Sequence, residues 1–274
     1  MDRFGGNLLH IAARLDRVDL LKLVVQFMTS DELGSLPFKR NKDDDTALDL
    51  ALKAKHKNAA MYLFKLAPKC SYLLNRFGVS TSYRTIELGD EDLVRYIFQL
   101  MLGNSMDSST RKSLLKAKMS VVYAAVKSRN NLGILEILME ELPDCIESSN
   151  EQGWKALSYA AYEDYLDKCR YILKKFPEAS RKNDRDGSFP IHKAVGAGHV
   201  YIVEEFLSSC PSTIYDVDRK GRTILHIRYA KADVFSYLTK KEQVENIFHF
   251  KDHKGRTFID LAQQFKNCTN ILAS

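Results

Sequence analysis

Apolar residues recur at helical spacing in short stretches of this chain, and a polar turn precedes each stretch. The turn positions are held by Gly5, Asp44, Gly78, Lys118, Gly153, Gly187, Gly221 and Gly255. The last four are spaced by 34 residues. A fixed period of this length is typical of repeats that bury their apolar faces only against their neighbours. We therefore predict an all-α solenoid of about eight helix-turn-helix repeats with hairpin-like loops.

Each repeat frame, meaning a turn position and the apolar stretch after it, also carries local signals for a turn followed by a helix. A turn glycine allows positive φ, and the residue two positions later can cap the helix. Competent caps stand there in six frames: Asn7, Thr46, Ser80, Ser120, Thr223 and Thr257. Lys155 and Phe189 hold the same position and cannot cap. Small residues within the helices predict close packing between repeats: Ala12, Ala51, Ala125, Ala160, Ala194 and Ala262.

Four prolines form a second periodic signal. Pro68, Pro143, Pro177 and Pro211 each stand ten residues before the next turn glycine, where a proline ends the second helix. The frames DRDGSFPIHKAV and DRKGRTILHI resemble the GxTPLHxA pattern of the ankyrin repeat. Together with GWKALSYAA, the helix-ending prolines make the chain similar to the plant ankyrin family of the accelerated cell death type. That resemblance implies a cytosolic ankyrin array, followed in the family by a carboxyl-terminal membrane domain, that acts in defence and cell-death signalling.

Uneven spacing between frames predicts the domain organisation. The polar segment 103–113 has no apolar periodicity, so we expect a flexible loop there. This loop would separate repeats 1–3, in residues 1–102, from repeats 4–8, in residues 114–274. The seventh repeat lacks about two residues between His226 and Val234, which predicts a shortened helix pair. The eighth repeat is incomplete at Ser274.

Composition excludes several classes of protein. The chain is 45% hydrophobic with a mean hydropathy of −0.29 and has no apolar run long enough for a membrane helix, which predicts a cytoplasmic chain. If a membrane domain follows in the natural protein, the expected location is the cytoplasmic side of that membrane. The net charge of +6 is spread evenly, so no nucleic-acid-binding arm is expected. The five cysteines contain no CxxC pair and indicate a reducing compartment.

We find no signature of catalysis, of a cofactor or of a metal site. P-loop, GxSxG and kinase motifs are absent from the sequence. Five of the seven histidines fall on repeat positions where the imidazole is expected to bind loop backbone: His10, His56, His192, His199 and His226. His249 and His253 lie four residues apart on an expected extended turn, where the helical geometry of a metal pair is not available. We therefore predict a non-enzymatic protein.

The remaining class of function is binding of a partner at the surface, and the residues beside the turn glycines are the candidate contacts. The proposed contacts are Arg185, Arg219, Lys220, Arg222, Lys254 and Arg256, as a basic row, with Trp154 and Tyr162 as exposed aromatics. The second turn instead carries Asp43, Asp44 and Asp45. These residues predict a protein partner, either an acidic segment or a membrane receptor.

The function that we predict is a protein–protein interaction scaffold in plant defence or cell-death signalling. The alternative is a regulatory ankyrin domain of a larger membrane protein, channel or ubiquitin ligase. Nothing within these residues separates the two, because a fold does not name its partner.

Overall fold

The computed structural model describes residues 5–103, 121–128, 132–227 and 232–264. The chain divides into two compact units, residues 1–148 and 149–274, which are described separately below. The loop expected at residues 103–113 lies outside the described residues, apart from Gly103 at the end of a helix. The expected division at that loop stays a prediction.

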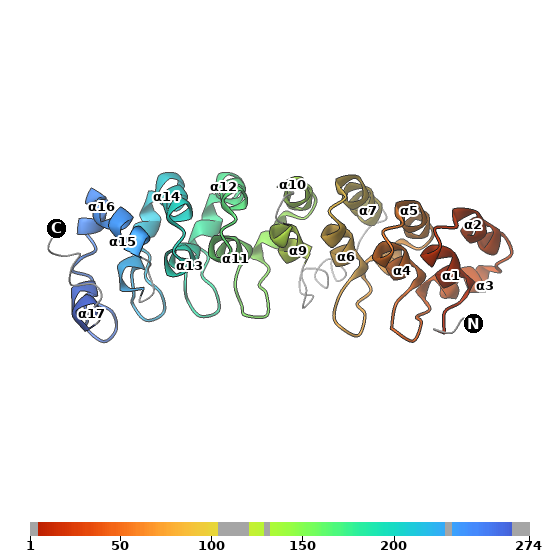
Figure 1. Ribbon diagram of the computed structural model, residues 1–274, viewed down its shortest axis with the longest axis horizontal. Coiled ribbons are helices and arrows are strands. Elements are labelled where there is room, and N and C mark those ends of the chain that lie inside the picture. Colours follow the sequence, from red (N-terminus) through yellow and green to blue (C-terminus); the bar gives the residue numbers. More distant parts are fainter. Residues whose placement is uncertain (1–4, 104–120, 129–131, 228–231, 265–274) are drawn as a thin grey trace. The chain divides into compact units, whose positions relative to one another are not determined.

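The first unit consists of helix pairs that stack in chain order (Figure 1). Its elements are α1 (Leu8–Arg14), α2 (Val18–Gln26), α3 (Ser30–Ser35), η1 (Leu36–Phe38), α4 (Ala47–Lys53), α5 (Lys57–Leu66), η2 (Pro68–Tyr72), α6 (Thr81–Leu88), α7 (Glu91–Gly103), α9 (Val121–Lys127), α10 (Leu132–Glu141) and η3 (Pro143–Glu147). First helices pack on first helices, as α1 does on α4 and α4 on α6, and second helices pack on second helices, as α5 does on α7.

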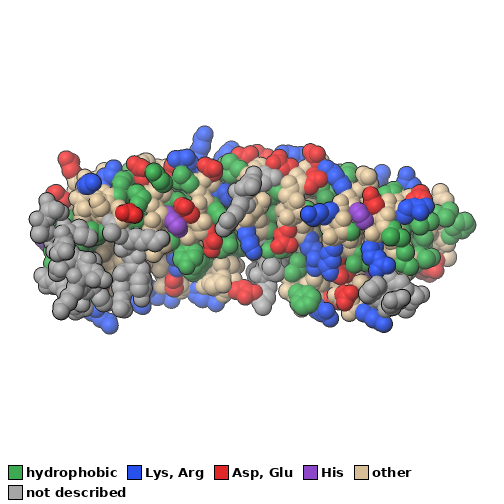
Figure 2. Space-filling model, in the orientation of Figure 1, with side chains coloured by type: hydrophobic (Ala, Val, Ile, Leu, Met, Phe, Trp, Pro, Cys, Tyr) green, Lys and Arg blue, Asp and Glu red, His purple; other side chains and the backbone are tan. Residues whose placement is uncertain are grey.

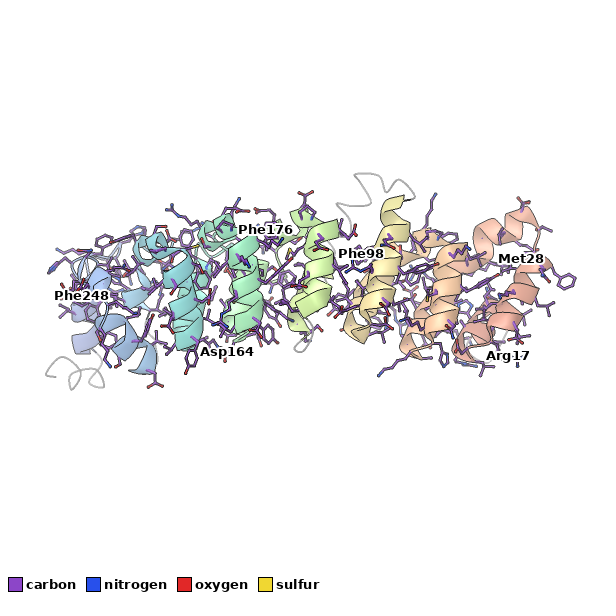
Figure 3. The ribbon with its side chains drawn as sticks, turned by 90° about the horizontal axis from the view of Figure 1, so that it is seen from above. Arg17, Met28, Phe98, Asp164, Phe176 and Phe248 are labelled. Atoms are coloured by element: carbon purple, nitrogen blue, oxygen red, sulfur yellow. The ribbon has the colours of Figure 1, made fainter. Side chains whose placement is uncertain are left out.

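The second unit repeats this arrangement. Its elements are α11 (Ala156–Tyr162), α12 (Leu166–Lys175), η4 (Pro177–Arg181), α13 (Pro190–Ala197), α14 (Val200–Ser209), η5 (Pro211–Tyr215), η6 (Ile224–His226), α15 (Ala232–Thr239), α16 (Glu242–Glu245) and α17 (Phe258–Gln264). Figure 3 shows α12 with Asp164 near one end and Phe176 at the other. The loops that precede the first helices of this unit project to one side of it (Figure 1).

Small side chains allow the close packing of the first helices. Ala12, Ala51, Ala125, Ala160 and Ala194 are at most 1% exposed, as their spacing predicts. Large apolar side chains of the second helices, such as Phe64, Phe98 and Phe206, are also buried. Within each unit the core is therefore a continuous layer between neighbouring repeats.

The turns and caps follow the sequence signals. Asn7, Thr46, Ser80 and Thr257 each accept the backbone N–H three residues later. Asp44 replaces glycine with a positive φ of 64°, a conformation that aspartate tolerates better than most residues. Lys155 makes no side-chain cap, as expected.

The four periodic prolines do more than end a helix. Each one opens a short 3₁₀ helix, because proline suits a first helical position and holds the preceding residue out of the α region. Residues inside these 3₁₀ turns, such as Cys145 and Ile214, are buried in the repeat. The sequence predicts the end of the helix but not this extra turn.

Five histidines tie neighbouring repeats together, three of them through loop backbone, as the sequence predicts, and two through carbonyl oxygens in the last turn of a helix. Nε2 of His10, His192 and His226 lies 3.0–3.1 Å from the carbonyl oxygens of Asp45, Arg222 and Arg256 respectively, each in the next repeat. His56 Nδ1 and His199 Nε2 lie 3.1 and 2.9 Å from the carbonyl oxygens of Ala13 and Tyr162, each in the preceding repeat. These imidazoles are structural.

The seventh repeat is shortened, as its missing residues predict. In place of a full first helix, the described residues contain one 3₁₀ turn, η6, before α15 begins at Ala232. In the eighth repeat α17 is described and Ile259 and Leu261 are half-buried, while the expected second helix lies outside the described residues. Among the helices that the structure describes, none combines the length and apolar character needed to cross a bilayer.

Candidate partner-binding surface

The hairpin turns of the second unit are built to one plan. We call them tips 5 to 8: residues 150–154, 184–188, 218–222 and 252–256. In tip 7, Asp218 N–H donates to the Arg222 carbonyl at 3.0 Å and Gly221 N–H to the Asp218 carbonyl at 2.9 Å. The same two hydrogen bonds close the other three tips. Each tip is thus a rigid turn that holds its central residues in solvent.

A buried aspartate organises tips 7 and 8 from within. Asp218 Oδ1 accepts the backbone N–H groups of Lys220 at 2.8 Å and Arg222 at 3.0 Å, and Asp252 Oδ1 accepts those of Lys254 and Arg256 at 2.9 and 3.0 Å. Burial alone would raise the pKa of Asp218, but its hydrogen bonds from Arg222 and the backbone outweigh burial and lower this pKa. Asp252, bound by Arg256, also has a lowered pKa. Both carboxylates are therefore charged and internally satisfied.

Consecutive tips are in direct contact through their glycines. A Cβ added to Gly153 would lie 2.5 Å from Arg185 Cβ, and one added to Gly187 would lie 2.5 Å from Arg219 Cβ. Backbone hydrogen bonds accompany this contact, from Arg185 N–H to the Gly153 carbonyl and from His253 N–H to the Lys220 carbonyl, both at 2.9 Å. The absence of a side chain thus lets the next tip lie against each glycine.

The six basic residues singled out in the sequence fall into two groups. Arg222 and Arg256 are half-buried and bind the aspartate of their own tip, with Nη2 to Oδ2 distances of 2.6 and 2.7 Å. The other four, Arg185, Arg219, Lys220 and Lys254, are exposed and form no ion pair within the described part of the chain. We call these four the tip row. Figure 2 shows Lys and Arg side chains along the edge of this unit where Figure 1 places the tips.

Trp154 and Tyr162 meet in an edge-to-face contact with ring centroids 4.9 Å apart. The Lys193 ammonium lies 4.4 Å from the centre of the Trp154 ring, and its Nζ is 2.8 Å from Asp186 Oδ2. Tyr162 is 45% exposed, whereas Trp154 is half-buried. The aromatic pair is therefore a partly exposed patch between tip 5 and α13. The sequence indicated the two aromatic residues but not Lys193, because the contact of Lys193 with Trp154 depends on the packing of α11 against α13.

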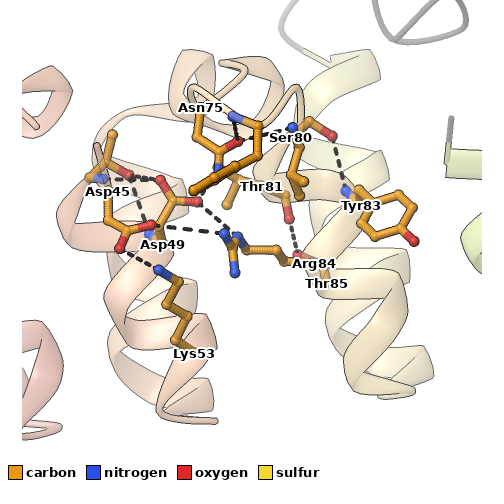
Figure 4. A network of polar contacts seen from close by, with 12 residues as sticks. Asp45, Asp49, Lys53, Asn75, Ser80, Thr81, Tyr83, Arg84 and Thr85 are labelled. Carbon is orange, nitrogen blue, oxygen red and sulfur yellow. Dashed lines mark hydrogen bonds and ion pairs between the residues drawn. The ribbon is translucent and has the colours of Figure 1, made fainter. Parts of the chain in front are cut away.

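The first unit contains a different polar cluster, shown in Figure 4. Arg84 on α6 lies 3.8 Å from Asp45 and 3.7 Å from Asp49, Thr81 Oγ1 donates to Asp49 at 3.1 Å, and Lys53 pairs with Asp45. Asp45 is buried, so the second turn does not present three exposed carboxylates as the sequence suggested. In the described residues no group of three or more His, Cys, Asp or Glu side chains is placed to hold a metal ion.

Solved structures with a similar fold decide what these repeats are. The ankyrin-repeat domain of Bcl-3, a member of the IkappaB protein family, matches with a TM-score of 0.71 over 86% of this chain and 99% of its own, at 19% sequence identity. The chain has the ankyrin-repeat fold. The human ASB11 ankyrin-repeat domain also matches, with a TM-score of 0.63 over 86% of this chain and 98% of its own, at 16% identity.

Sequence comparison of this ankyrin-repeat chain finds a distant plant relative. Protein ACCELERATED CELL DEATH 6 of Arabidopsis thaliana is 29% identical over 202 residues, which cover 68% of this chain and 30% of the relative. The chain thus matches less than a third of the length of that protein. No family model matches the chain.

The two groups of basic residues predict different outcomes of charge reversal. Arg222→Glu places a carboxylate against the buried Asp218, and we expect the free energy of unfolding to fall by about 1–3 kcal/mol. Arg219→Glu, one residue beyond the same aspartate, changes a free side chain and should shift it by less than about 0.5 kcal/mol. Urea denaturation followed by the fluorescence of Trp154, the single tryptophan, measures both. Equal effects would show that the Arg222–Asp218 pair does not stabilise the tip.

Proposed function

We propose that this chain is a non-enzymatic protein-interaction scaffold in plant defence or cell-death signalling. The observation that carries the binding role is the tip row: four exposed cations on successive rigid turns, whose charged groups form no ion pair within the described residues. Exposed charges on a pre-formed surface are available to a partner without a cost for ordering the loops.

The defence role rests on similarity to the plant relative. The name of that relative refers to accelerated cell death, and the similarity covers 68% of this chain. The match spans 30% of the relative, so the similarity concerns one portion of that longer protein. A regulatory ankyrin domain of a larger membrane protein, acting at the cytoplasmic side of a membrane, is the second candidate that this partial coverage favours.

The test is a cell-death assay in leaf tissue with two matched variants. The tip variant is Arg219→Glu, Lys220→Glu and Lys254→Glu. The control is Lys174→Glu, Lys175→Glu and Lys240→Glu, which makes the same charge change at exposed residues at or just beyond the ends of α12 and α15 in the same unit. We expect the wild type and the control to change electrolyte leakage after an elicitor equally, and the tip variant to have no effect.

Two outcomes would contradict the proposal separately. If expression of the wild type leaves leakage unchanged, the defence role is wrong. If the tip variant acts like the wild type, the tip row is not the surface that carries the function. Circular dichroism of the three purified proteins establishes that all are folded before the comparison is made.

A further inference from the structure

The tip row has a geometry that selects one kind of acidic partner. Arg219 and Lys220 occupy the two outermost positions of tip 7, and Lys254 occupies the second of these positions in tip 8. The aspartates of these tips do not neutralise the row, because Asp218 and Asp252 are buried and bound by Arg222 and Arg256. Tips 7 and 8 thus present exposed cations without an exposed carboxylate, whereas in tip 6 the exposed Asp186 follows Arg185.

Contact between tips fixes the repeat distance of the charges. Arg219 lies against Gly187 and His253 lies against Gly221, so tips 6, 7 and 8 follow one another without intervening chain. Adjacent packed helices lie about 8–10 Å apart, and the tips share the spacing of the helices that carry them. An extended chain advances by about 3.3 Å per residue, so three of its residues span one tip-to-tip step.

We propose that tips 6 to 8 bind an extended acidic protein segment whose carboxylates recur at every third residue. This inference rests on the proposed function as a protein-binding scaffold and names the partner chemistry of its surface. Carboxylates at positions i, i+3 and i+6 of the segment meet Arg185, then Arg219 or Lys220, then Lys254. Arginine suits this role because its planar guanidinium can bind a carboxylate through two hydrogen bonds.

Residues beyond the cations favour a peptide over an anionic membrane. The outermost residues of tips 7 and 8 are Arg219, Lys220, His253 and Lys254, and none of them is an apolar side chain that could enter a bilayer. At tip 5 the two outermost positions are the exposed Glu151 and Gln152, and the Trp154–Tyr162 pair next to them offers an apolar contact to a peptide side chain. Exposed cations at tips 7 and 8, with an aromatic pair two repeats earlier, match a peptide with acidic and apolar positions.

The test compares two synthetic peptides of identical composition on the full chain. In one, glutamates separated by pairs of Ser or Gly stand at every third position, and in the other the same glutamates are contiguous. Fluorescence anisotropy of labelled peptides should give about fivefold tighter binding for the spaced peptide, because contiguous carboxylates reach only one tip. Binding should weaken as salt is raised from about 50 to 200 mM, since exposed ion pairs are screened.

Variants assign this binding to the tip row. Arg219→Glu, Lys220→Glu and Lys254→Glu together should weaken binding of the spaced peptide at least about tenfold. The Lys174→Glu, Lys175→Glu, Lys240→Glu control should bind it within about twofold of the wild type. Matching circular dichroism spectra and unfolding midpoints exclude misfolding as the cause.

Four outcomes would overturn the inference. Equal affinity for the two peptides would contradict the three-residue spacing of the carboxylates. Unchanged peptide binding by the tip variant would show that the tip row is not the binding surface. Binding to phosphatidylserine vesicles that depends on the tip row, with no peptide binding, would identify a lipid surface instead. If neither peptide binds but the leaf assay gives the expected result, the proposal of an acidic segment is wrong and the proposed scaffold function still holds.

Discussion

Replacing Gly187 by alanine should lower the free energy of unfolding of the second unit by about 3 kcal/mol or more. Gly187 has a φ of +79°, where an L-residue costs about 1–2 kcal/mol. The new Cβ would also lie 2.5 Å from Arg219 Cβ and 3.0 Å from its backbone nitrogen, so tip 7 must move away from tip 6. Urea denaturation, followed through Trp154 fluorescence, measures the loss.

Gly255 supplies the matched control for this prediction. Its φ of +72° is nearly the same, yet a Cβ added there meets nothing within 4 Å in the described structure. Gly255→Ala should therefore cost only about 1 kcal/mol, from backbone strain partly offset by a less flexible unfolded chain. A similar loss for both variants would mean that contact between tips does not stabilise the array.

The second large effect is expected at His192. This buried imidazole accepts the Phe189 N–H through Nδ1 at 3.3 Å and donates from Nε2 to the Arg222 carbonyl at 3.0 Å, which requires a neutral ring. His192→Leu removes both bonds and should cost about 2–3 kcal/mol. His192→Asn should recover part of this loss, because a side-chain oxygen can accept the N-cap N–H, as Asp49 does from Thr46.

The same histidine should make stability depend on pH. Burial lowers the pKa of His192 to about 4. The nearby Arg222 and Lys193 cations lower this pKa further, and the Asp218 carboxylate opposes the shift without cancelling it. Because the unfolded ring takes up a proton near pH 6.5 and the folded ring only near 4, this contribution is complete above pH 6.5 and is lost as the pH falls to 4. The shift corresponds to about 3 kcal/mol.

A comparison of variants isolates that titration. Burial raises the pKa of Asp184 to about 6, so its protonation favours the folded state over part of the same range and opposes the effect of His192. The quantity to measure is therefore the difference in unfolding free energy between the wild type and His192→Leu, from pH 7 to pH 4. This difference should shrink as the pH falls, and a constant difference would contradict a neutral, buried His192.

Much of the local structure could be predicted because its cause is local. The positive φ at the turn glycines and the caps at Asn7 and Thr46 each depend on a few adjacent residues, and the period of 34 residues can be read directly from the spacing of those turns. The 3₁₀ turns after Pro143 and its equivalents were not predicted, since a proline that ends one helix is equally compatible with an irregular loop.

The candidate binding surface could be predicted less well, because the sequence does not show which of the neighbouring cations form an ion pair within their own turn. The sequence places Arg219, Lys220 and Arg222 together as one basic cluster. The signal that separates them was present, an aspartate four residues before the arginine in DRKGR and DHKGR, but its importance depends on that aspartate being buried. The sites themselves, Trp154 and Tyr162 included, stay predictions that the charge-reversal and peptide experiments address.

The sequence by itself determined the helix pairs and the shortened seventh repeat, because helical periodicity and capping act over a few residues. The structural role of five histidines could be predicted because each one stands at a fixed position of the repeat. Only the tertiary structure decided which cations are free. Arg222 and Arg256 bind a buried aspartate, while Arg219 packs against Gly187 through its Cβ and remains exposed. The reason is that the charge available to a partner depends on burial and on contacts between repeats 34 residues apart, and neither is set by the residues adjacent in the chain.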